Sequence, residues 1–591
     1  MNQGTQAAAP MKSDVITVGE LLADNTQYKV PIYQRVYSWK AEQWRQLWSD
    51  LVELSEDDEN RKVHFLGPLI CSDYYLTPGG LNRYLLVDGQ QRIATLLFLL
   101  TALRESIKRK PEARQCAEEL NQHLLNSKQT ALDTYKLVPL EKDMTLFKEV
   151  IHGQMEVGKG KKPNIYKAYL FFKQIIKEHE GKLDFELLIL NLLGRMTLIR
   201  IALGDFDNAH EVFSSINAKG ENLKEHQLIK NYLFMHIEPH LQERADDMLW
   251  EPISQRLGDT YLTRFFNCFV NKNGKVYKVK DTYTAIRDDY NAFSKDITKD
   301  QGVRDYLETI DRFSKYYASF LKTETEYEQR PAVRTALEFF QPKILNVSDP
   351  YYLNPHTFLL NLFEAEYQKE ITEVELIRSM GILQNLIVRA ILFGNDLKSM
   401  NSFFSMLHGE VMNLKPQVQR YDSYLKNHLG TGQRKLVGYN YKNDKAFEQH
   451  RFLVNLNDPT DKGKDFTLYL LKQMEQCAKG RVLSKENIYK AVRIMPTELS
   501  NEWSNENNLK NSDHRQFVNY IGNFALYYAH AQDENTLFQQ KKKQIPKDIY
   551  INNGIFEFQT WNTDSILKRS KELFISHIAK LWPDLSDTAS Q

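Results

Sequence analysis

The chain has 591 residues, and its 77 Lys and Arg residues are balanced by 76 Asp and Glu residues. With 42% hydrophobic and 26% charged residues, the composition is that of an ordinary globular protein, which excludes a wholly disordered or fibrous chain. A formal charge of +1 demands no polyanionic partner, so any contact with nucleic acid must come from local patches. At roughly 100–200 residues per domain, the length predicts three or four domains.

Cysteine usage and hydrophobic patterning indicate the compartment. The four cysteines lie far apart and form no Cys-x-x-Cys pair, so we expect reduced thiols and neither a disulfide framework nor a zinc knuckle. No stretch approaches 18 apolar residues, and the first residues lack the apolar run of a signal peptide. We therefore expect a cytoplasmic protein without a membrane-spanning segment.

Residues 1–12 are expected to form a disordered tail, and residues 13–235 to form a mixed α+β domain. In this domain, a Trp-rich helix is predicted over residues 41–54. From Gln91 onward the apolar residues recur three and four positions apart, which predicts a second helix. Runs of aromatic and β-branched residues predict strands over residues 28–33, 63–71 and 83–87.

The remaining chain divides into a helical and a mixed part. Residues 236–435 show long helical patterns with few strand signals, so an all-α connector is expected there. Its clearest helices are predicted over residues 303–323, 331–340 and 373–393. Residues 436–591 again mix strand and helix signals, and they close with a predicted helix over 564–580. The expected fold class is therefore α+β, multidomain and largely helical.

The most informative stretch is Asp-Gly-Gln-Gln-Arg at residues 88–92, which joins a predicted strand to a predicted helix. A helix N-terminus leaves backbone N–H groups unpaired and carries positive partial charge, so it suits a phosphate. Gly89 lets the backbone approach closely, Arg92 offers a guanidinium fork, and Asp88 can hold Mg²⁺ against that phosphate. The alternative is a plain helix entry, in which Asp88 caps the helix and Arg92 pairs with a carboxylate.

Three further stretches carry clustered polar residues. The first, residues 31–39, combines three aromatic residues with polar ones, and its candidate residues are Tyr33, Gln34 and Arg35. The second, residues 64–67, reads His-Phe-Leu-Gly. The third, residues 213–223, contains a polar turn between two apolar stretches, with Asn217 and Lys219 as candidates. Taken singly, each stretch is typical of packing or capping.

Together these stretches resemble the N-terminal domain of the GmrSD-type modification-dependent (type IV) restriction endonucleases. The resemblance covers about residues 15–235 and rests on PIYQRVYSW, HFLG, LLVDGQQRIATLL and FSSINAKGENLKEHQLIKNYL. That domain is related to the ParB-like nucleotide-binding fold, and it also occurs in the phosphorothioate-sensing protein SspE. One departure is Gln227, where the family usually has an Asp.

This resemblance implies that the domain binds and hydrolyses a nucleoside triphosphate with Mg²⁺, and that this hydrolysis is coupled to DNA restriction. It implies catalytic roles for Asp88, Gln91 and Arg92, with Asp88 also as the metal ligand. It implies nucleotide contacts from Tyr33, Gln34, Arg35, Gly89, Gln90, Asn217 and Lys219.

The last part of the chain, residues 436–591, resembles the second domain of the same family, a His-Me finger (HNH-like) nuclease with an H-x-x-P signature. The landmarks that align are RIMP at 493–496, IGNFAL at 521–526 and WNTDSI at 561–566. The resemblance places a degenerate nuclease site at Arg493, Pro496, Asn523 and Asn535. It also makes Lys541, Lys542 and Lys543 candidate DNA contacts.

The position of the general base in this nuclease-like site holds Arg493, where the family has His. A general base needs a pKa near neutral, whereas arginine stays protonated to above about pH 12 and only donates hydrogen bonds. Arg493 can still hold a phosphate or stabilise charge. His514, in a polar setting, is a candidate replacement base; the alternative is that this domain has become a DNA-binding or partner-docking module.

These features lead to two hypotheses. The first is an antiphage restriction protein with a nucleotide-hydrolysing N-terminal domain and a nuclease-derived domain that engages phage DNA, modified or unmodified. The second is a catalytically silent subunit that binds nucleotide and DNA and supports a paired, intact relative, as a homo- or hetero-oligomer. Residues 88–92 favour the first for the N-terminal half, and Arg493 favours the second for the C-terminal half. We expect little or no DNA cleavage from this chain alone.

Overall fold

The computed structural model of the chain divides into two units, Met1–Asp246 and Asp247–Gln591, and each is considered by itself. The structure describes residues 12–23, 25–56, 62–76, 81–108, 114–127, 132–155, 162–203, 224–321, 330–345, 355–392, 400–414, 420–430, 464–480, 483, 488–507, 509, 514–515, 517–529, 536–583 and 585.

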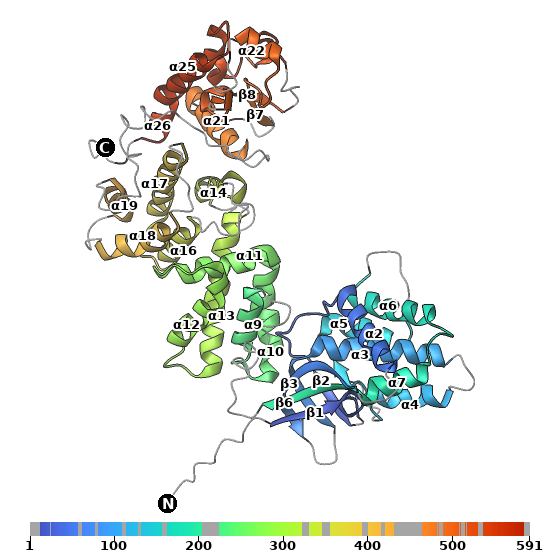
Figure 1. Cartoon of the computed structure of the whole chain (residues 1–591). Coiled ribbons are helices and arrows are strands. Elements are labelled where there is room, and N and C mark those ends of the chain that lie inside the picture. Colours follow the sequence, from blue (N-terminus) through green and yellow to red (C-terminus); the bar gives the residue numbers. More distant parts are fainter. Residues whose placement is uncertain are drawn as a thin grey trace, which may run out of the picture. The chain divides into compact units, whose positions relative to one another are not determined.

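The first unit contains a six-stranded mixed sheet with the strand order β1-β6-β3-β4-β2-β5. Its strands β1, β2, β3 and β6 are labelled in Figure 1. The pairs β1–β6 and β3–β4 are antiparallel, and the other neighbours are parallel. The strands are β1 (Lys12–Thr17), β2 (Thr26–Lys29), β3 (His64–Leu76), β4 (Asn82–Asp88), β5 (Leu137–Val138) and β6 (Met196–Leu203).

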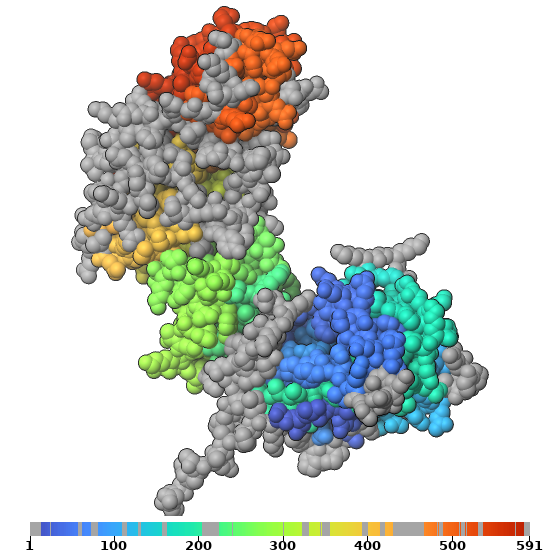
Figure 2. All heavy atoms as spheres, in the orientation of Figure 1, coloured from blue at the N-terminus to red at the C-terminus, as the bar shows by residue number. Residues whose placement is uncertain are grey.

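Four of the described helices of the first unit surround α3, which is buried at nearly every position. Apolar residues occupy all sides of α3 rather than one stripe, and a helix of that kind belongs in a core. It packs against α4, α5, α6 and α7, while α2 and α6 form much of the visible surface of this unit (Figures 1 and 2). The helices are α1 (Val18–Leu21), α2 (Ala41–Ser55), α3 (Gln90–Ile107), α4 (Arg114–Leu124), α5 (Glu141–Ile151), α6 (Asn164–Glu178), α7 (Phe185–Gly194), α9 (Glu225–Phe234) and α10 (Pro239–Ala245).

The strand expected over residues 28–33 ends earlier, at Lys29. Pro31 has no backbone N–H for a strand ladder, and its carbonyl accepts a hydrogen bond from Gln34 N (3.0 Å) in a turn. The segment that follows is therefore irregular up to the start of α2. A second difference is Lys12, expected in the tail, which is the first residue of β1.

The second unit begins with a helical part, and its described residues between 247 and 430 contain no strand. The helices expected over 303–323, 331–340 and 373–393 correspond to α13, α14 and α17. Its elements are η2 (Asp246–Trp250), which starts at the end of the first unit, α11 (Glu251–Asn271), η3 (Val279–Asp281), α12 (Thr282–Phe293), α13 (Lys299–Leu321), α14 (Pro331–Glu338), α15 (Pro342–Leu345), α16 (His356–Tyr367), α17 (Glu373–Leu392), α18 (Asn401–Leu414) and α19 (Tyr421–Gly430).

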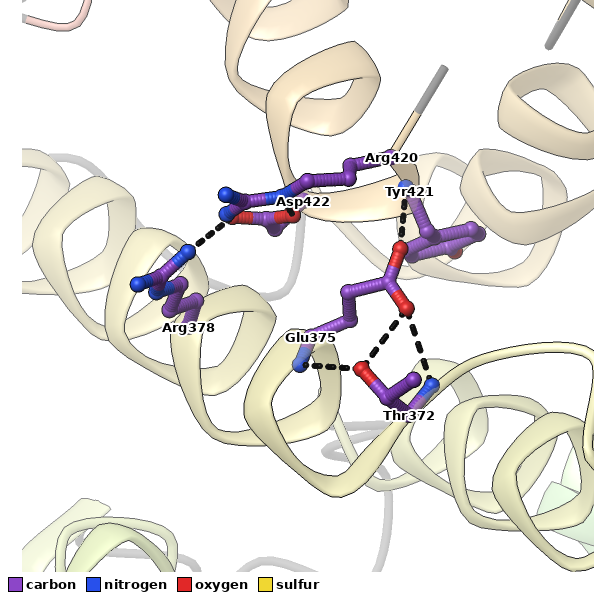
Figure 3. A network of polar contacts seen from close by, with 6 residues as sticks. All are labelled: Thr372, Glu375, Arg378, Arg420, Tyr421 and Asp422. Carbon is purple, nitrogen blue, oxygen red and sulfur yellow. Dashed lines mark hydrogen bonds and ion pairs between the residues drawn. The ribbon is translucent and has the colours of Figure 1, made fainter. Parts of the chain in front are cut away.

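One carboxylate in this helical part caps two helices (Figure 3). Glu375 Oε2 accepts hydrogen bonds from the backbone N and the hydroxyl of Thr372 (2.9 and 2.8 Å), at the start of α17. Its other oxygen accepts from the backbone N of Tyr421 (2.9 Å), the first residue of α19. The first N–H groups of a helix have no partner within the helix, so Glu375 joins the two N-termini.

Asp422, in the first turn of α19, forms ion pairs beside this double cap (Figure 3). Its two carboxylate oxygens accept hydrogen bonds from Nε and Nη2 of Arg420, and Arg378 Nη1 lies 3.8 Å from Oδ2. The Asp422 side chain is nearly buried, so these cations offset the loss of its hydration.

The C-terminal part of the second unit combines a two-stranded antiparallel sheet, in which Arg493 lies opposite Phe524, with several helices. Its core is formed around Trp503 and Trp561. The elements are α21 (Lys464–Lys479), β7 (Tyr489–Arg493), α22 (Asn501–Asn507), η6 (Ile521–Asn523), β8 (Phe524–Tyr528), α24 (Phe538–Gln544), η7 (Tyr550–Glu557), α25 (Thr563–Leu573), η8 (Phe574–Ile578) and α26 (Ala579–Leu581).

The chain is thus mostly helical with a small sheet, as the sequence predicts. None of its described helices combines the length and the apolar character needed to cross a lipid bilayer.

Candidate functional site

The stretch at residues 88–92 forms a strand–turn–helix corner. Asp88 ends β4, and Gly89 follows with a φ of 103° and precedes the first turn of α3. The positive φ favours glycine here, and a Cβ at this position would lie 2.5 Å from Leu69 Cδ1, so the leucine side chain would have to shift. Because glycine has no side chain, it cannot cap α3, and it leaves the first amides of the helix without a cap from that position.

Arg92 ties this corner to the neighbouring strand. Its Nη2 lies 3.2 Å from Asp88 Oδ2, and its Nη1 donates a hydrogen bond to the carbonyl of Pro68 in β3. The guanidinium lies against Gly67, whose φ is 111°. About one fifth of each charged side chain remains exposed (21% for Arg92 and 19% for Asp88), so neither is fully buried.

Gln90 and Gln91 turn away from solvent and hold the irregular segment that precedes α2. Gln90 Nε2 donates to Gln34 Oε1 (3.2 Å) and to the carbonyl of Arg35 (3.1 Å). Gln91 Oε1 accepts from the backbone N of Ser38 (2.8 Å). Both glutamines are buried, and these hydrogen bonds join them to the protein rather than to solvent.

The three candidate residues of that segment have different environments. Tyr33 is buried, and burial raises the pKa of its hydroxyl. Gln34 Nε2 donates to the carbonyl of Val87 (2.7 Å), one residue before Asp88, whereas Arg35 is half-buried. These contacts place the segment directly beside the start of α3. Asn217 and Lys219 lie outside the described residues.

Gln227, at the position where the sequence resemblance implies an Asp, lies in the first turn of α9. Its Oε1 accepts a hydrogen bond from the backbone N of Lys224 (3.0 Å), so the amide performs the capping that a carboxylate would perform. The side-chain nitrogen of Asn231, in the orientation that satisfies its neighbours, donates to the carbonyls of Gln227 (3.1 Å) and Tyr33 (2.5 Å). Through Asn231, α9 contacts the segment beside the corner.

The described residues contain no group of three His, Cys, Asp or Glu side chains placed to hold a metal ion. Mg²⁺ commonly binds to proteins through one or two carboxylates, with phosphate oxygens and waters as its other ligands. A partly exposed Asp88 beside a glycine that lacks a Cβ fits that mode of binding.

In the C-terminal part, Arg493 is the last residue of β7. Its guanidinium lies over the ring of Phe524, 5.1 Å from the ring centroid, and its Nη2 donates to Asn519 Oδ1 (3.2 Å). These two contacts together fix the orientation of the Arg493 guanidinium. Sequence reasoning missed Asn519, and only the fold brings it to Arg493.

Lys541 and Asn523 support the backbone that follows Arg493. Lys541 Nζ donates to the carbonyls of Arg493 (2.9 Å) and Ile494 (3.0 Å), and Asn523 Nδ2 donates to the carbonyl of Met495 (3.0 Å). Lys541 is only 1% exposed and Asn523 is fully buried. The expectation that Lys541 contacts DNA is therefore wrong, because its ammonium group is used inside the domain.

The other candidates of this domain have separate positions. His514 Nε2 lies 2.7 Å from the carbonyl of Pro496. Lys542 Nζ donates to the carbonyl of Phe558 (2.6 Å), and Lys543 is exposed. Asn535 lies outside the described residues. Of the three candidate lysines, Lys543 has the greatest access to a polyanion.

Sequence reasoning also missed two supports of the N-terminal corner. Asp143 Oδ2 accepts from the backbone N of Tyr37 (2.7 Å), and burial raises the pKa of its carboxyl group. Gly67 receives the Arg92 guanidinium. For Gly67 a signal was present, in the His-Phe-Leu-Gly stretch, whereas Asp143 lies 106 residues from its partner in the chain.

Comparison with known proteins identifies the family to which the chain belongs. None of the curated proteins compared with the chain matches it. The model of the GmrSD restriction endonuclease N-terminal domain matches residues 18–234, and that of the GmrSD restriction endonuclease C-terminal domain matches residues 446–575. The two matches together cover more than half of the chain and contain both sites described above. The chain therefore belongs to the GmrSD restriction endonuclease family.

Proposed function

We propose that this chain acts as a type IV restriction-like defence protein in which the N-terminal unit binds and hydrolyses a nucleoside triphosphate and the C-terminal domain engages DNA. The family assignment supports the class of activity. The observation that carries the nucleotide proposal is the start of α3, where Gly89 provides no cap and Asp88 and Arg92 lie beside the first amides.

The N-terminal corner suits the triphosphate for three reasons. The first amides of α3 and the helix dipole attract an anion. Asp88 would hold Mg²⁺ together with phosphate oxygens, and the ion would neutralise charge that develops on the phosphates. Arg92 orients the Asp88 carboxylate, and the half-buried Arg35 supplies a second cation nearby.

Gln90 and Gln91 serve this proposal through the segment that they hold. Their hydrogen bonds fix residues 34–38 against α3, so the position of Arg35 relative to the helix start depends on them. Tyr33 supports the same segment from its buried side. Asn217 and Lys219 complete the proposed nucleotide contacts on the basis of the sequence resemblance. This N-terminal arrangement is proposed to be a ParB-like nucleotide-binding domain.

The C-terminal domain is proposed to be a His-Me-finger-like module that binds DNA. Arg493 cannot act as a general base, since its guanidinium stays protonated, but it suits a phosphate of the DNA backbone. Lys543, exposed on α24, and Lys542 beside it can add phosphate contacts. The target is proposed to be phage DNA.

A second candidate function is a catalytically silent subunit that works with an intact paired nuclease. The observation that favours it is Arg493 at the end of β7, where the resemblance implies the base. The two candidates differ in nucleotide turnover, which only the first requires.

The test is release of phosphate from each nucleoside triphosphate in Mg²⁺ by the purified full chain and by Asp88→Asn. The substitution preserves shape and removes the charge that would hold the ion, so turnover should fall by about 10²-fold or more. Asp133→Asn is the matched control, because Asp133 pairs with Arg83 (2.7 Å), near the start of β4, at the strand end opposite Asp88. Full turnover in Asp88→Asn, or no nucleotide binding by the wild type, would contradict the proposal.

A further inference from the structure

The backbone of the segment Arg493–Pro496 is held at each of its four carbonyls by a side chain. Lys541 donates to the first two, Asn523 donates to the third, and His514 contacts the fourth. Asn523 also accepts from the backbone N of Met495 (2.8 Å). A backbone supported at every residue keeps the groups attached to it in fixed positions, which is what a reacting site needs.

A single turn of chain connects the two ends of this segment. His514 and Asn519 lie on one turn, in which Val518 N donates to His514 O (3.0 Å). His514 contacts Pro496, whereas Asn519 contacts the Arg493 guanidinium (3.2 Å). The four residues Arg493–Pro496 span at most about 11 Å between their first and last Cα atoms. The His514 imidazole, which contacts Pro496, and the Arg493 guanidinium therefore belong to one small region.

The contact with Pro496 determines which nitrogen of His514 can take up a proton. A carbonyl oxygen only accepts, so in the neutral imidazole Nε2 carries the hydrogen and Nδ1 keeps its lone pair. Within the described part of the chain, no residue hydrogen-bonds to Nδ1. The ring is half-buried, and the contact of Nε2 fixes its orientation.

The expectation of little or no DNA cleavage rests on Arg493 alone. Against it, we propose that His514 is the general base for hydrolysis of a DNA phosphodiester in this domain, replacing the histidine that position 493 lacks. His514 Nδ1 takes a proton from water as the water oxygen forms a bond to phosphorus. The bond from phosphorus to the leaving oxygen breaks, and that oxygen takes a proton from solvent. Arg493 holds the negatively charged phosphoryl oxygens. The inference rests on the proposed engagement of DNA by this domain.

The competing explanation is that His514 only supports the Pro496 carbonyl. A glutamine at this position can donate the same hydrogen bond but cannot take up a proton. His514→Gln therefore separates the two roles. His577→Gln is the matched control, since His577 is a half-buried histidine of the same domain in η8.

The experiment measures binding and cleavage of phage DNA, with and without base or backbone modification, by the full chain in Mg²⁺ or Mn²⁺. We expect the wild type and His577→Gln to cut, and His514→Gln to bind DNA equally but to cut about 10²-fold more slowly. DNA binding without cleavage by the wild type, or equal cleavage by His514→Gln, would overturn the inference alone. Absence of DNA binding would overturn the proposed role of the domain and this inference with it.

A chemical rescue keeps the test decisive if His514→Gln loses its fold. Imidazole added to His514→Ala can enter the space of the missing ring and act as the base. Cleavage by His514→Ala that rises with imidazole concentration supports the inference, and cleavage that imidazole leaves unchanged contradicts it. Thermal melting of each variant shows whether the domain is folded during the assay.

Discussion

Arg92 and Asp88 form an ion pair of 3.2 Å across the first turn of α3, and the same guanidinium donates to the carbonyl of Pro68 in β3. One side chain thus joins the helix start, the strand end and the adjacent strand. The pair fixes the carboxylate to which we assign Mg²⁺.

Replacing Arg92 by Lys tests this geometry. A lysine has one donor group and cannot reproduce the fork that contacts Pro68 and Asp88 together, so we expect nucleotide turnover to fall by about tenfold to 10²-fold. Arg83→Lys is the control, since Arg83 pairs with Asp133 near the start of β4, at the end opposite Asp88. The rate of phosphate release measures nucleotide turnover by both variants. Equal turnover in Arg92→Lys and the wild type would contradict the assigned role.

Gln91→Leu should act on stability and nucleotide affinity. The substitution removes the acceptor of Ser38 N, so we expect the free energy of unfolding of the first unit to fall by about 1–3 kcal/mol. The Michaelis constant for the nucleotide should rise because the segment carrying Arg35 loosens. Gln91→Glu keeps the acceptor and should change both quantities less. A loss of kcat with unchanged stability and KM would instead indicate direct catalysis by Gln91.

Lys541 and Lys543 should respond in opposite ways to substitution. Lys541→Met removes the buried donor to the carbonyls of Arg493 and Ile494, so we expect a loss of about 2–4 kcal/mol in the free energy of unfolding. Lys543→Ala should keep the free energy of unfolding within about 0.5 kcal/mol of the wild type. It should reduce by about one the slope of the logarithm of DNA affinity against the logarithm of salt concentration. Urea denaturation and fluorescence anisotropy measure the two effects. Normal stability of Lys541→Met would show that its contacts contribute little.

Glu375→Ala should weaken the junction of α17 and α19. The substitution removes the acceptor for Thr372 N and Tyr421 N together, so the free energy of unfolding should fall by about 1–3 kcal/mol. Glu370→Ala, at an exposed position of the same helical part, is the control and should change it by less than about 0.5 kcal/mol. Equal melting temperatures of the two variants would refute the double cap.

Acid should destabilise the helical part through His356. Burial lowers the pKa of His356 from 6.5 to about 4, and Nε2 of its neutral ring lies 2.9 Å from the carbonyl of Phe340. Between these pH values the unfolded chain binds the proton and the folded chain does not. This contribution to stability is therefore complete above about pH 6.5 and is lost as the pH falls toward 4.

The lowering of the His356 pKa from 6.5 to about 4 corresponds to about 3 kcal/mol of the free energy of unfolding. His356→Gln removes the titration and should flatten the fall in stability between pH 6.5 and 4. His240→Gln, at a histidine with a side chain 70% exposed, should leave the fall unchanged. Denaturation at several pH values measures both, and parallel curves for His356→Gln and the wild type would exclude His356 as the cause.

The sequence predicted much of the local structure. The Trp-rich helix and the long helices of the connector follow from apolar spacing alone, and the corner at Gly89 follows from a strand pattern, a glycine and a helix pattern in succession. The strand expected beyond Lys29 was wrong because Pro31 interrupts the hydrogen-bond ladder, and here a local rule for proline outweighed the aromatic pattern.

Contacts between distant residues were beyond the sequence. A run of three lysines on a helix indicates a solvated basic face, yet Lys541 points into the domain, where two carbonyls accept from its ammonium group. The sequence resemblance implies that the glutamines after Gly89 act on the nucleotide, and the fold uses both to hold a segment more than 50 residues away in the chain.

By itself, the sequence determined the elements, the turn that requires glycine and the absence of a base at Arg493, because these depend on each residue and its neighbours. Only the tertiary structure decided that Arg92 holds Asp88, that Lys541 is buried and that His514 meets Pro496. Such contacts depend on which surfaces the chain brings together as it buries its apolar residues, and burial then dictates which polar groups must be paired.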